Sequence, residues 1–324
     1  MTERGNALAP AGAVRRRAPD FFIVGHPKSG TSALFQMLRS NPRLHMPRKE
    51  PSFFVPEIWP AGWRKYANGI DDYLAYFDEA EPEQLIGEAS TAYLWSQHAA
   101  TRIAEVQPDA RIIAILREPA SFLRSLHLQF VRSNVENESD LRKAIALDQE
   151  RGEGKRLPPN STRPQALVYS EHVRYAEQLR RYQAAFGRER VLVLIYEDFR
   201  ADNERTIGEV LDFLDVDPTA PVELIEANHA SGVRSPRLYD LVRSVYLGRS
   251  PAMRPVKAAI KALTPRRARH RAVSAVNRMQ RSDPPPVDAE LMDELRRRFK
   301  GEVESLGEHL DRDLVSFWGY DRID

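Results

Sequence analysis

The sequence predicts an α/β fold in which a central parallel sheet lies between two layers of helices. Short apolar runs that are typical of buried strands alternate along the chain with segments of helical periodicity. Two of the predicted strands end in a polar or glycine-containing segment and lead directly into a helix. With 324 residues, of which 42% are hydrophobic, the chain can bury a core of the size that such a fold requires.

The first predicted strand, residues 21–24, leads through a loop into a helix that includes residues 33–38. Glycines occupy both ends of this loop, at Gly25 and Gly30. A loop of this kind directs backbone N–H groups and the positive end of a helix dipole at one point, which favours an anion. The pattern therefore predicts a phosphate-binding loop, although an ordinary strand-to-helix turn is the alternative.

The position of the lysine separates this loop from the P-loop of nucleoside triphosphatases. A P-loop has its lysine directly after the last glycine, where this chain has Thr31, followed by Ser32. The lysine of this chain is Lys28, which lies inside the loop. Its ammonium group would therefore reach a different phosphate oxygen.

A second predicted strand, residues 111–116, is followed at once by Arg117 and then by a helix over residues 121–131, which carries Ser125. Ligands of open α/β sheets bind at the carboxyl ends of strands. A guanidinium group forms bidentate, charge-assisted hydrogen bonds with a phosphate, and a hydroxyl adds a further donor. This strand end is therefore a second candidate for contacts with phosphate.

Both segments resemble the sulfotransferases that use 3′-phosphoadenosine 5′-phosphosulfate (PAPS). The resemblance implies a P-loop-like three-layer sandwich, with the central sheet flanked by helices. It also implies that the 5′-phosphosulfate of the donor is held by Lys28, Ser29, Gly30, Thr31 and Ser32. In the family, an arginine at the end of a strand and a serine eight positions later bind the 3′-phosphate. This spacing assigns Arg117 and Ser125 to that role.

Three other segments resemble the Golgi heparan-sulfate and glycan sulfotransferases and their bacterial relatives. They are residues 49–54 (KEPSFF), residues 69–73 (GIDDY) and the Glu-x-Ser-x-x-Tyr pattern that begins at Glu88. The resemblance implies that Glu88, near the end of a short strand, is the general base, a role that suits a buried carboxylate with a raised pKa. The alternative is a solvated residue or a salt-bridge partner. We expect Lys49 to face the donor sulfate or the acceptor, and the aromatic residues to pack in the core.

Residues 228–237 occupy the place of the basic loop that covers the 3′-phosphate and adenine in the family. This segment lacks the Arg-Lys-Gly or Lys-Gly-Arg triplet of that loop. We assign Arg234 to the donor site, with Arg237 as the alternative.

The charge distribution is uneven. Residues 241–282 contain eleven lysines and arginines and no aspartate or glutamate, in a chain whose net charge is only +2. Three interpretations stay open: a solvated helical insert, a flap that steers an anionic donor or acceptor, and contact with an anionic membrane surface. We expect a disordered leader over residues 1–19, without the apolar core of a signal peptide, and a single sulfotransferase domain over residues 20–324 that contains this insert.

The sequence thus predicts a cytoplasmic enzyme that transfers a sulfuryl group from PAPS to a hydroxyl or amine of a small-molecule or glycan acceptor, without a metal. A P-loop nucleotide kinase or NTPase is one alternative, but it requires lysine after Gly30. A basic nucleic-acid-binding protein is another, but residues 241–282 have few aromatics for base stacking, so we expect no nucleic acid. The absence of cysteine excludes disulfides and thiolate chemistry. The sequence determines neither the acceptor nor the oligomeric state.

Overall fold

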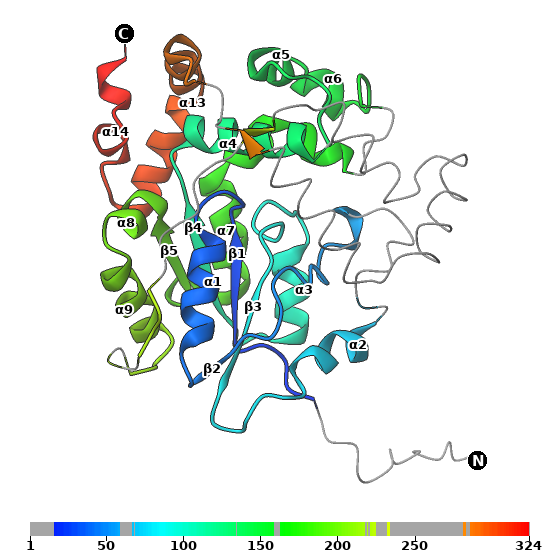
Figure 1. The fold of residues 1–324 in the computed structure, drawn as a ribbon, viewed down its shortest axis with the longest axis vertical. Helices are drawn as coiled ribbons and strands as arrows, with labels where there is room; N and C mark the ends of the chain where they lie inside the picture. The colour runs from blue at the N-terminus through cyan, green and yellow to red at the C-terminus, as the bar shows by residue number, and fades with distance from the viewer. Residues whose placement is uncertain are drawn as a thin grey trace, which may run out of the picture.

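A five-stranded parallel sheet forms the centre of the computed structural model, with the strand order β2-β3-β1-β4-β5 (Figure 1). The strands are β1 (Phe21–Gly25), β2 (Leu44–His45), β3 (Leu85–Ala89), β4 (Arg111–Leu116) and β5 (Val191–Ile195). The chain places β2 and β3 on one side of β1, and β4 and β5 on the other. A reversal of this kind opens a crevice at the carboxyl ends of the central strands.

The structure describes residues 16–58, 67, 69–133, 135–158, 163–217, 219, 221–224, 232–233, 281–282 and 286–323. Its α-helices are α1 (Thr31–Ser40), α2 (Ile70–Leu74), α3 (Ala99–Val106), α4 (Pro119–Arg132), α5 (Leu141–Ala146), α6 (Asp148–Gly152), α7 (Tyr175–Phe186), α8 (Tyr196–Ala201), α9 (Asn203–Phe213), α13 (Ala289–Leu310) and α14 (Leu314–Phe317). Single 3₁₀ turns lie at Pro56–Ile58, Ala75–Phe77, Pro164–Leu167, Tyr169–Val173, Arg188–Arg190 and Tyr320–Arg322. None of the described helices is long and apolar enough to cross a membrane.

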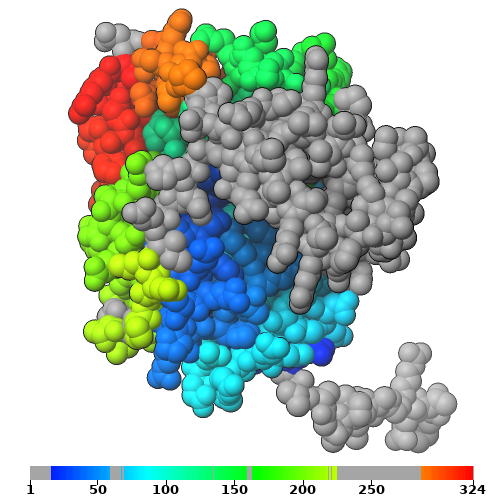
Figure 2. Space-filling model, in the orientation of Figure 1, coloured from blue at the N-terminus to red at the C-terminus, as the bar shows by residue number. Residues whose placement is uncertain are grey.

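Side chains that alternate along the strands divide the core into two layers. Phe22 and Ile112 face the layer that also receives α3, α7 and α13. Their neighbours Phe21 and Ile113 face the opposite layer, which is covered by α1 and α9. In Figures 1 and 2, α1 and α9 lie side by side on this second face. The arrangement confirms the predicted α/β class, because both faces of the parallel sheet are covered by helices.

The predicted strands agree with the observed ones to within a few residues, since each is a continuous apolar run between polar segments. Contacts between segments that are distant in the sequence could not be predicted from these runs. Glu197 and Asp198 lie in the first turn of α8 and contact the C-terminal part of the chain. Glu197 accepts a hydrogen bond from Trp318 (3.0 Å), and Asp198 pairs with Arg312 (2.5 Å). Residues 16–19, at the end of the predicted leader, are among the described residues, and Arg16 forms an ion pair with Asp78 (2.9 Å).

A second, two-stranded antiparallel sheet joins β6 (Gly232–Val233) to β7 (Arg281–Ser282). Residues of β6 lie against α4, the helix that follows β4. The segment between these two strands contains most of the basic stretch and lies outside the described residues.

Candidate active site

The loop between β1 and α1 has the conformation of an anion-binding loop. Gly30 adopts a left-handed conformation (φ 86°), and a Cβ at this position would lie 3.1 Å from the rings of Tyr196 and Phe199. Glycine is therefore required here both by the backbone and by the available space. α1 begins at Thr31 and has no acidic residue in its first turn, so no negative charge competes for its N-terminal N–H groups. The Thr31 side chain is buried and that of Ser32 is exposed.

The structure brings Lys28 and Arg117 together. Arg117 follows β4 directly, and its Nη1 donates a hydrogen bond to the carbonyl oxygen of Lys28 (3.1 Å). Its guanidinium also stacks over the ring of Tyr196, 4.8 Å from the centroid. These contacts hold the arginine against the phosphate loop, although the two residues are far apart in the sequence.

Two further arginines on α4 belong to the same cationic group. The pKa of Lys28 is lowered by burial first, and then by the charges of Arg132 and Arg117. Burial and the charge of Arg117 likewise lower the pKa of Arg124. Cations held close enough to repel one another favour an anionic ligand with several charges. We refer to Lys28, Arg117, Arg124 and Arg132 as the cationic cluster.

Sequence reasoning missed Arg124 and Arg132. A helical projection gives the signal that could have found Arg132, because it lies seven residues after Ser125 and so on the same helix face. Arg124 has no such relation to Ser125. Its place in the cluster depends on how α4 is oriented relative to Arg117.

Two serine hydroxyls near these cations have no hydrogen-bond partner among the described residues. The side chains of Ser29 and Ser125 are buried, and the described residues offer neither hydroxyl a hydrogen bond. A buried polar group without a partner costs about 1–3 kcal/mol. A bound phosphate oxygen would satisfy such a hydroxyl, so both serines fit the predicted donor site.

Glu88 lies on β3, one residue before its end, and its carboxylate is fully buried. The oxygen Oε2 accepts hydrogen bonds from the hydroxyls of Tyr73 (2.7 Å) and Tyr93 (3.0 Å). Burial raises the pKa of Glu88 to about 7, against the opposing effect of the Ser90, Tyr73 and Tyr93 hydroxyls. A carboxylate with a pKa near neutrality can accept a proton at physiological pH and release it again.

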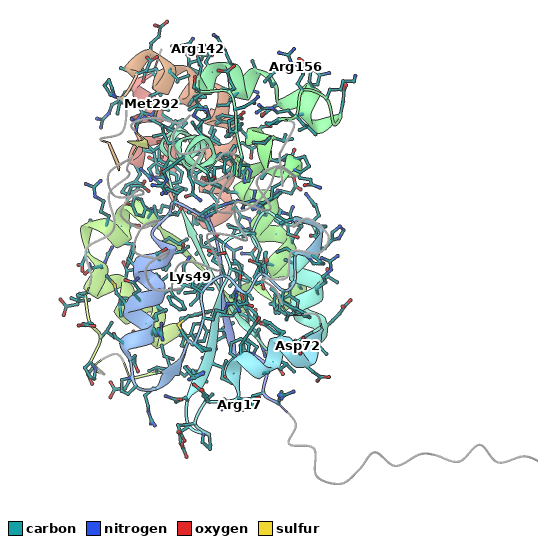
Figure 3. All side chains as sticks on the ribbon, turned by 45° about the vertical axis from the view of Figure 1, so that its right-hand side comes forward. Arg17, Lys49, Asp72, Arg142, Arg156 and Met292 are labelled. Atoms are coloured by element: carbon teal, nitrogen blue, oxygen red, sulfur yellow. The ribbon has the colours of Figure 1, made fainter. Side chains whose placement is uncertain are left out.

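Lys49 lies beside the same strand end. Its backbone pairs with Ala89, and its Nζ forms an ion pair with Glu50 Oε1 (2.9 Å). Glu50 also accepts hydrogen bonds from the backbone N–H and the hydroxyl of Thr91. Figure 3 shows Lys49 well away from Arg17, which precedes β1 at the opposite edge of the sheet. Lys49 is thus at the carboxyl edge of the sheet, with its charge shared by Glu50.

His26 anchors the phosphate loop, a role that the sequence analysis did not predict. Its Nε2 lies 2.6 Å from Oε1 of Gln178 on α7. The Gln178 amide donates to the carbonyls of Glu171 and His172, so its oxygen must accept from His26. Complete burial lowers the pKa of His26 to about 3, and the ring is therefore neutral. The ring joins the loop to α7 without adding charge.

Arg234 and Arg237 lie outside the described residues. The last described residue before Arg234 is Val233 of β6, and β6 lies against the helix that carries Ser125. Within the described ranges, no group of three or more His, Asp or Glu side chains is arranged to hold a metal ion.

Comparison with known proteins identifies the family. The family described as "Sulfotransferase domain" matches residues 18–232, which include the phosphate loop, β3 and the cationic cluster. The chain therefore belongs to the sulfotransferase domain family.

Two relatives from Mus musculus illustrate the range of similarity. The chain is 27% identical to carbohydrate sulfotransferase 15 over 273 residues, covering 68% of this chain and 48% of that protein. It is 32% identical to heparan sulfate glucosamine 3-O-sulfotransferase 6 over 111 residues, covering 34% of this chain and 30% of that protein. The chain thus spans about half the length, or less, of these curated relatives.

The fold also resembles that of a solved bacterial protein. The crystal structure of a sulfotransferase from Alicyclobacillus acidocaldarius has a TM-score of 0.66 at 24% sequence identity. The match covers 93% of this chain and 98% of that one. This similarity concerns the fold alone.

Proposed function

We propose that this chain transfers the sulfuryl group of PAPS to a hydroxyl or amine of a carbohydrate-type acceptor. The observation that carries the proposal is the contact of Arg117 with the Lys28 carbonyl, which joins the cationic cluster to the phosphate loop at the carboxyl edge of the sheet. PAPS has a phosphosulfate at its 5′ end and a phosphate at its 3′ position. Both ends of the donor therefore require cations and hydrogen-bond donors.

The described residues provide two groups of contacts for such a donor. The backbone of residues 28–32 and the hydroxyls of Ser29 and Thr31 hold the 5′-phosphosulfate at the start of α1. Arg117 and the unpartnered hydroxyl of Ser125 bind the 3′-phosphate. Selection of PAPS over ATP follows from this second group, because ATP has no 3′-phosphate.

In the transfer itself, the acceptor oxygen or nitrogen forms a bond to sulfur while the bond from sulfur to the bridging oxygen breaks. Lys28 donates a hydrogen bond to the bridging oxygen and stabilises the negative charge that develops there. Glu88 takes the proton from the acceptor. The products are the sulfated acceptor and 3′-phosphoadenosine 5′-phosphate (PAP), and Glu88 returns its proton to water.

The carbohydrate class of the acceptor rests on the relatives, whose names refer to carbohydrate and heparan sulfate substrates. A nucleotide kinase is not favoured, because Thr31 occupies the position of the P-loop lysine and Arg117 follows the strand where an acidic Mg²⁺ ligand would be expected.

Two measurements test the proposal. Calorimetric titration should show PAP binding without Mg²⁺, and binding that is much tighter than that of adenosine 5′-phosphate. Incubation with sulfur-labelled PAPS should then label at least one member of a panel of desulfated glycosaminoglycan oligosaccharides. Binding of ATP only in the presence of Mg²⁺, with no binding of PAP, would overturn the donor assignment. Labelling of phenols alone would overturn the acceptor class and leave the donor assignment in place.

A further inference from the structure

The two oxygens of Glu88 have different surroundings. Oε2 accepts hydrogen bonds from both Tyr73 and Tyr93, whereas Oε1 has no hydrogen-bond partner in the described part of the chain. The side chains of all three residues are completely buried. An unpaired carboxylate oxygen in such a site is costly unless a ligand satisfies it.

The direction of both hydrogen bonds is fixed. The Tyr93 hydroxyl oxygen accepts from the backbone N–H of Phe54 (3.4 Å), which leaves its proton for Glu88. The hydroxyl of Tyr73 donates to the same carboxylate oxygen. Burial and the neighbouring carboxylate raise the pKa of each tyrosine well above its usual value, so both remain protonated donors.

The two rings are held rigidly by different elements. Tyr73, on α2, stacks on Phe53 with ring centroids 4.6 Å apart and an interplanar angle of 12°. It also meets Phe54 and Phe77 edge to face. Tyr93 follows β3 and contacts the edge of Phe54. The hydroxyls are therefore positioned by packing before any ligand arrives.

We propose that Tyr73 and Tyr93 are positioning residues that occupy Oε2 of Glu88 and so make Oε1 the oxygen that takes the acceptor proton. This inference rests on the proposed role of Glu88 as the general base. It goes further in assigning a separate task to each oxygen and in giving two aromatic residues a role in the reaction. The proton of the acceptor hydroxyl or amine moves to Oε1 as the new bond to sulfur forms.

The tyrosines also affect the charge of Glu88. The groups that face it are Tyr73 from α2, Tyr93 and Ser90 from the segment after β3, Tyr182 from α7 and Glu50 from the loop before η1 (Pro56–Ile58). Burial and Glu50 raise the pKa of Glu88, whereas the hydroxyls of Tyr73 and Tyr93, which donate to Oε2, and the neighbouring Ser90 hydroxyl oppose the rise. Removing one donor therefore removes stabilisation of the carboxylate, and the pKa of Glu88 must rise.

The chain offers a matched control for this experiment. Tyr182 is equally buried and close enough to feel the charge of Glu88, but its hydroxyl has no hydrogen-bond partner among the described residues. Tyr73→Phe, Tyr93→Phe and Tyr182→Phe each remove one hydroxyl and retain the ring. Only the first two remove a hydrogen bond to Glu88.

The test titrates Glu88 by carbon-13 NMR of labelled glutamate, with the resonance assigned by its loss in Glu88→Gln. Tyr73→Phe and Tyr93→Phe should each raise the pKa of Glu88 by about one unit, as expected for losing one hydrogen bond to a charged group. The acidic limb of the kcat profile should move to higher pH by the same amount, and kcat at pH 7 should fall roughly fivefold, because the deprotonated fraction of Glu88 falls by that factor. The affinity for PAP should not change in any of the three variants. The pKa of Glu88 should not change in Tyr182→Phe. Circular dichroism and PAP affinity show whether each variant is folded.

The possible outcomes separate the inference from the proposed function. An unchanged Glu88 pKa in both folded tyrosine variants would refute the positioning role, even if Glu88→Gln is inactive. Full turnover in Glu88→Gln would refute the general base and the assignment of Oε1 together. A raised pKa with an unshifted kcat profile would show that the tyrosines act on the carboxylate but not on proton transfer, which would also overturn the inference.

Discussion

Arg117→Ala tests the role of the cationic cluster. Arg117 follows β4 and contacts the loop after β1. The side chain contributes one hydrogen bond to the Lys28 carbonyl and one contact with the ring of Tyr196. A hydrogen bond from a charged donor contributes about 1.5–3 kcal/mol and a cation–π contact about 0.5–1 kcal/mol. The arginine also repels Lys28 and Arg124. Since these effects oppose each other, we expect the variant to unfold at nearly the same denaturant concentration as the wild type.

Binding of the donor should respond quite differently. In the proposed site Arg117 contacts the 3′-phosphate, and loss of a charge-assisted contact of this kind costs about 2–4 kcal/mol. The Kd for PAP should therefore rise roughly 30- to 700-fold. The Kd for adenosine 5′-phosphate, which lacks the 3′-phosphate, should change much less. Isothermal titration calorimetry with both nucleotides measures the two effects on the same protein sample.

The opposite end of the same strand provides the control. Arg111 begins β4 at the far edge of the sheet and forms an ion pair with Asp215. Arg111→Ala removes the same charge and should leave both affinities unchanged at moderate salt, because the distance to the site exceeds the screening length of roughly 10 Å. An equal loss of affinity for both nucleotides in Arg117→Ala would move Arg117 to the 5′ end of the donor. Unchanged affinity for PAP in the folded variant would remove it from the site.

Two other predictions follow from the titrating groups. Lys28→Ala should lose both turnover and PAPS affinity in steady-state assays, because its ammonium contacts the phosphosulfate before and during transfer, and a loss confined to KM would contradict this. Burial lowers the pKa of His172 to about 4. The ring therefore stays neutral in the folded state, whereas it takes up a proton below about pH 6.5 in the unfolded state. The free energy of unfolding consequently decreases as the pH is lowered below about 6.5. His172→Gln should therefore lose roughly 2 kcal/mol less stability than the wild type between pH 7 and pH 5 in urea titrations. An equal loss of stability in the variant and the wild type would show that the pKa of His172 is not lowered in the folded state.

The sequence was most informative where local pattern and chemistry coincide. Residues 21–24 and 111–116 are continuous apolar runs that end in a glycine or an arginine, so both the strands and their ends could be predicted. The loop with Lys28 and Gly30 could be recognised because the left-handed backbone conformation at Gly30 requires a glycine, which is visible in the local sequence. The order of the strands within the sheet depends on long-range pairing and could not be read from these runs.

Roles that arise from long-range contacts could not be predicted from the sequence. The sequence predicts that the aromatic residues around Tyr73 pack in the core, and the ring of Tyr73 does so. Its hydroxyl gains a partner only because α2 lies beside β3, 15 residues away in the sequence. Arg124 joins the cationic cluster because α4 is oriented towards Arg117. A helical pattern shows which residues share a face, but not what that face contacts.

The pH dependence of stability can distinguish a catalytic role of Glu88 from a structural one. Burial raises its pKa to about 7, so folding disfavours the carboxylate and this cost grows as pH rises through the unfolded value near 4.5. By linkage the cost is about 1 kcal/mol at pH 5 and about 3 kcal/mol at pH 8. Glu88→Gln removes this dependence.

Relative to the wild type, the stability of Glu88→Gln should therefore improve by roughly 2 kcal/mol between pH 5 and pH 8, measured by urea unfolding at both pH values. Any constant cost of burying the amide cancels in this difference. Turnover should fall by about 10²–10⁴-fold, as expected when a general base is lost. A carboxylate kept for an ion pair would show the opposite sign, with the variant losing relative stability as pH rises. A variant that gains stability at high pH while losing turnover would identify Glu88 as a group whose burial serves proton transfer at the expense of the fold.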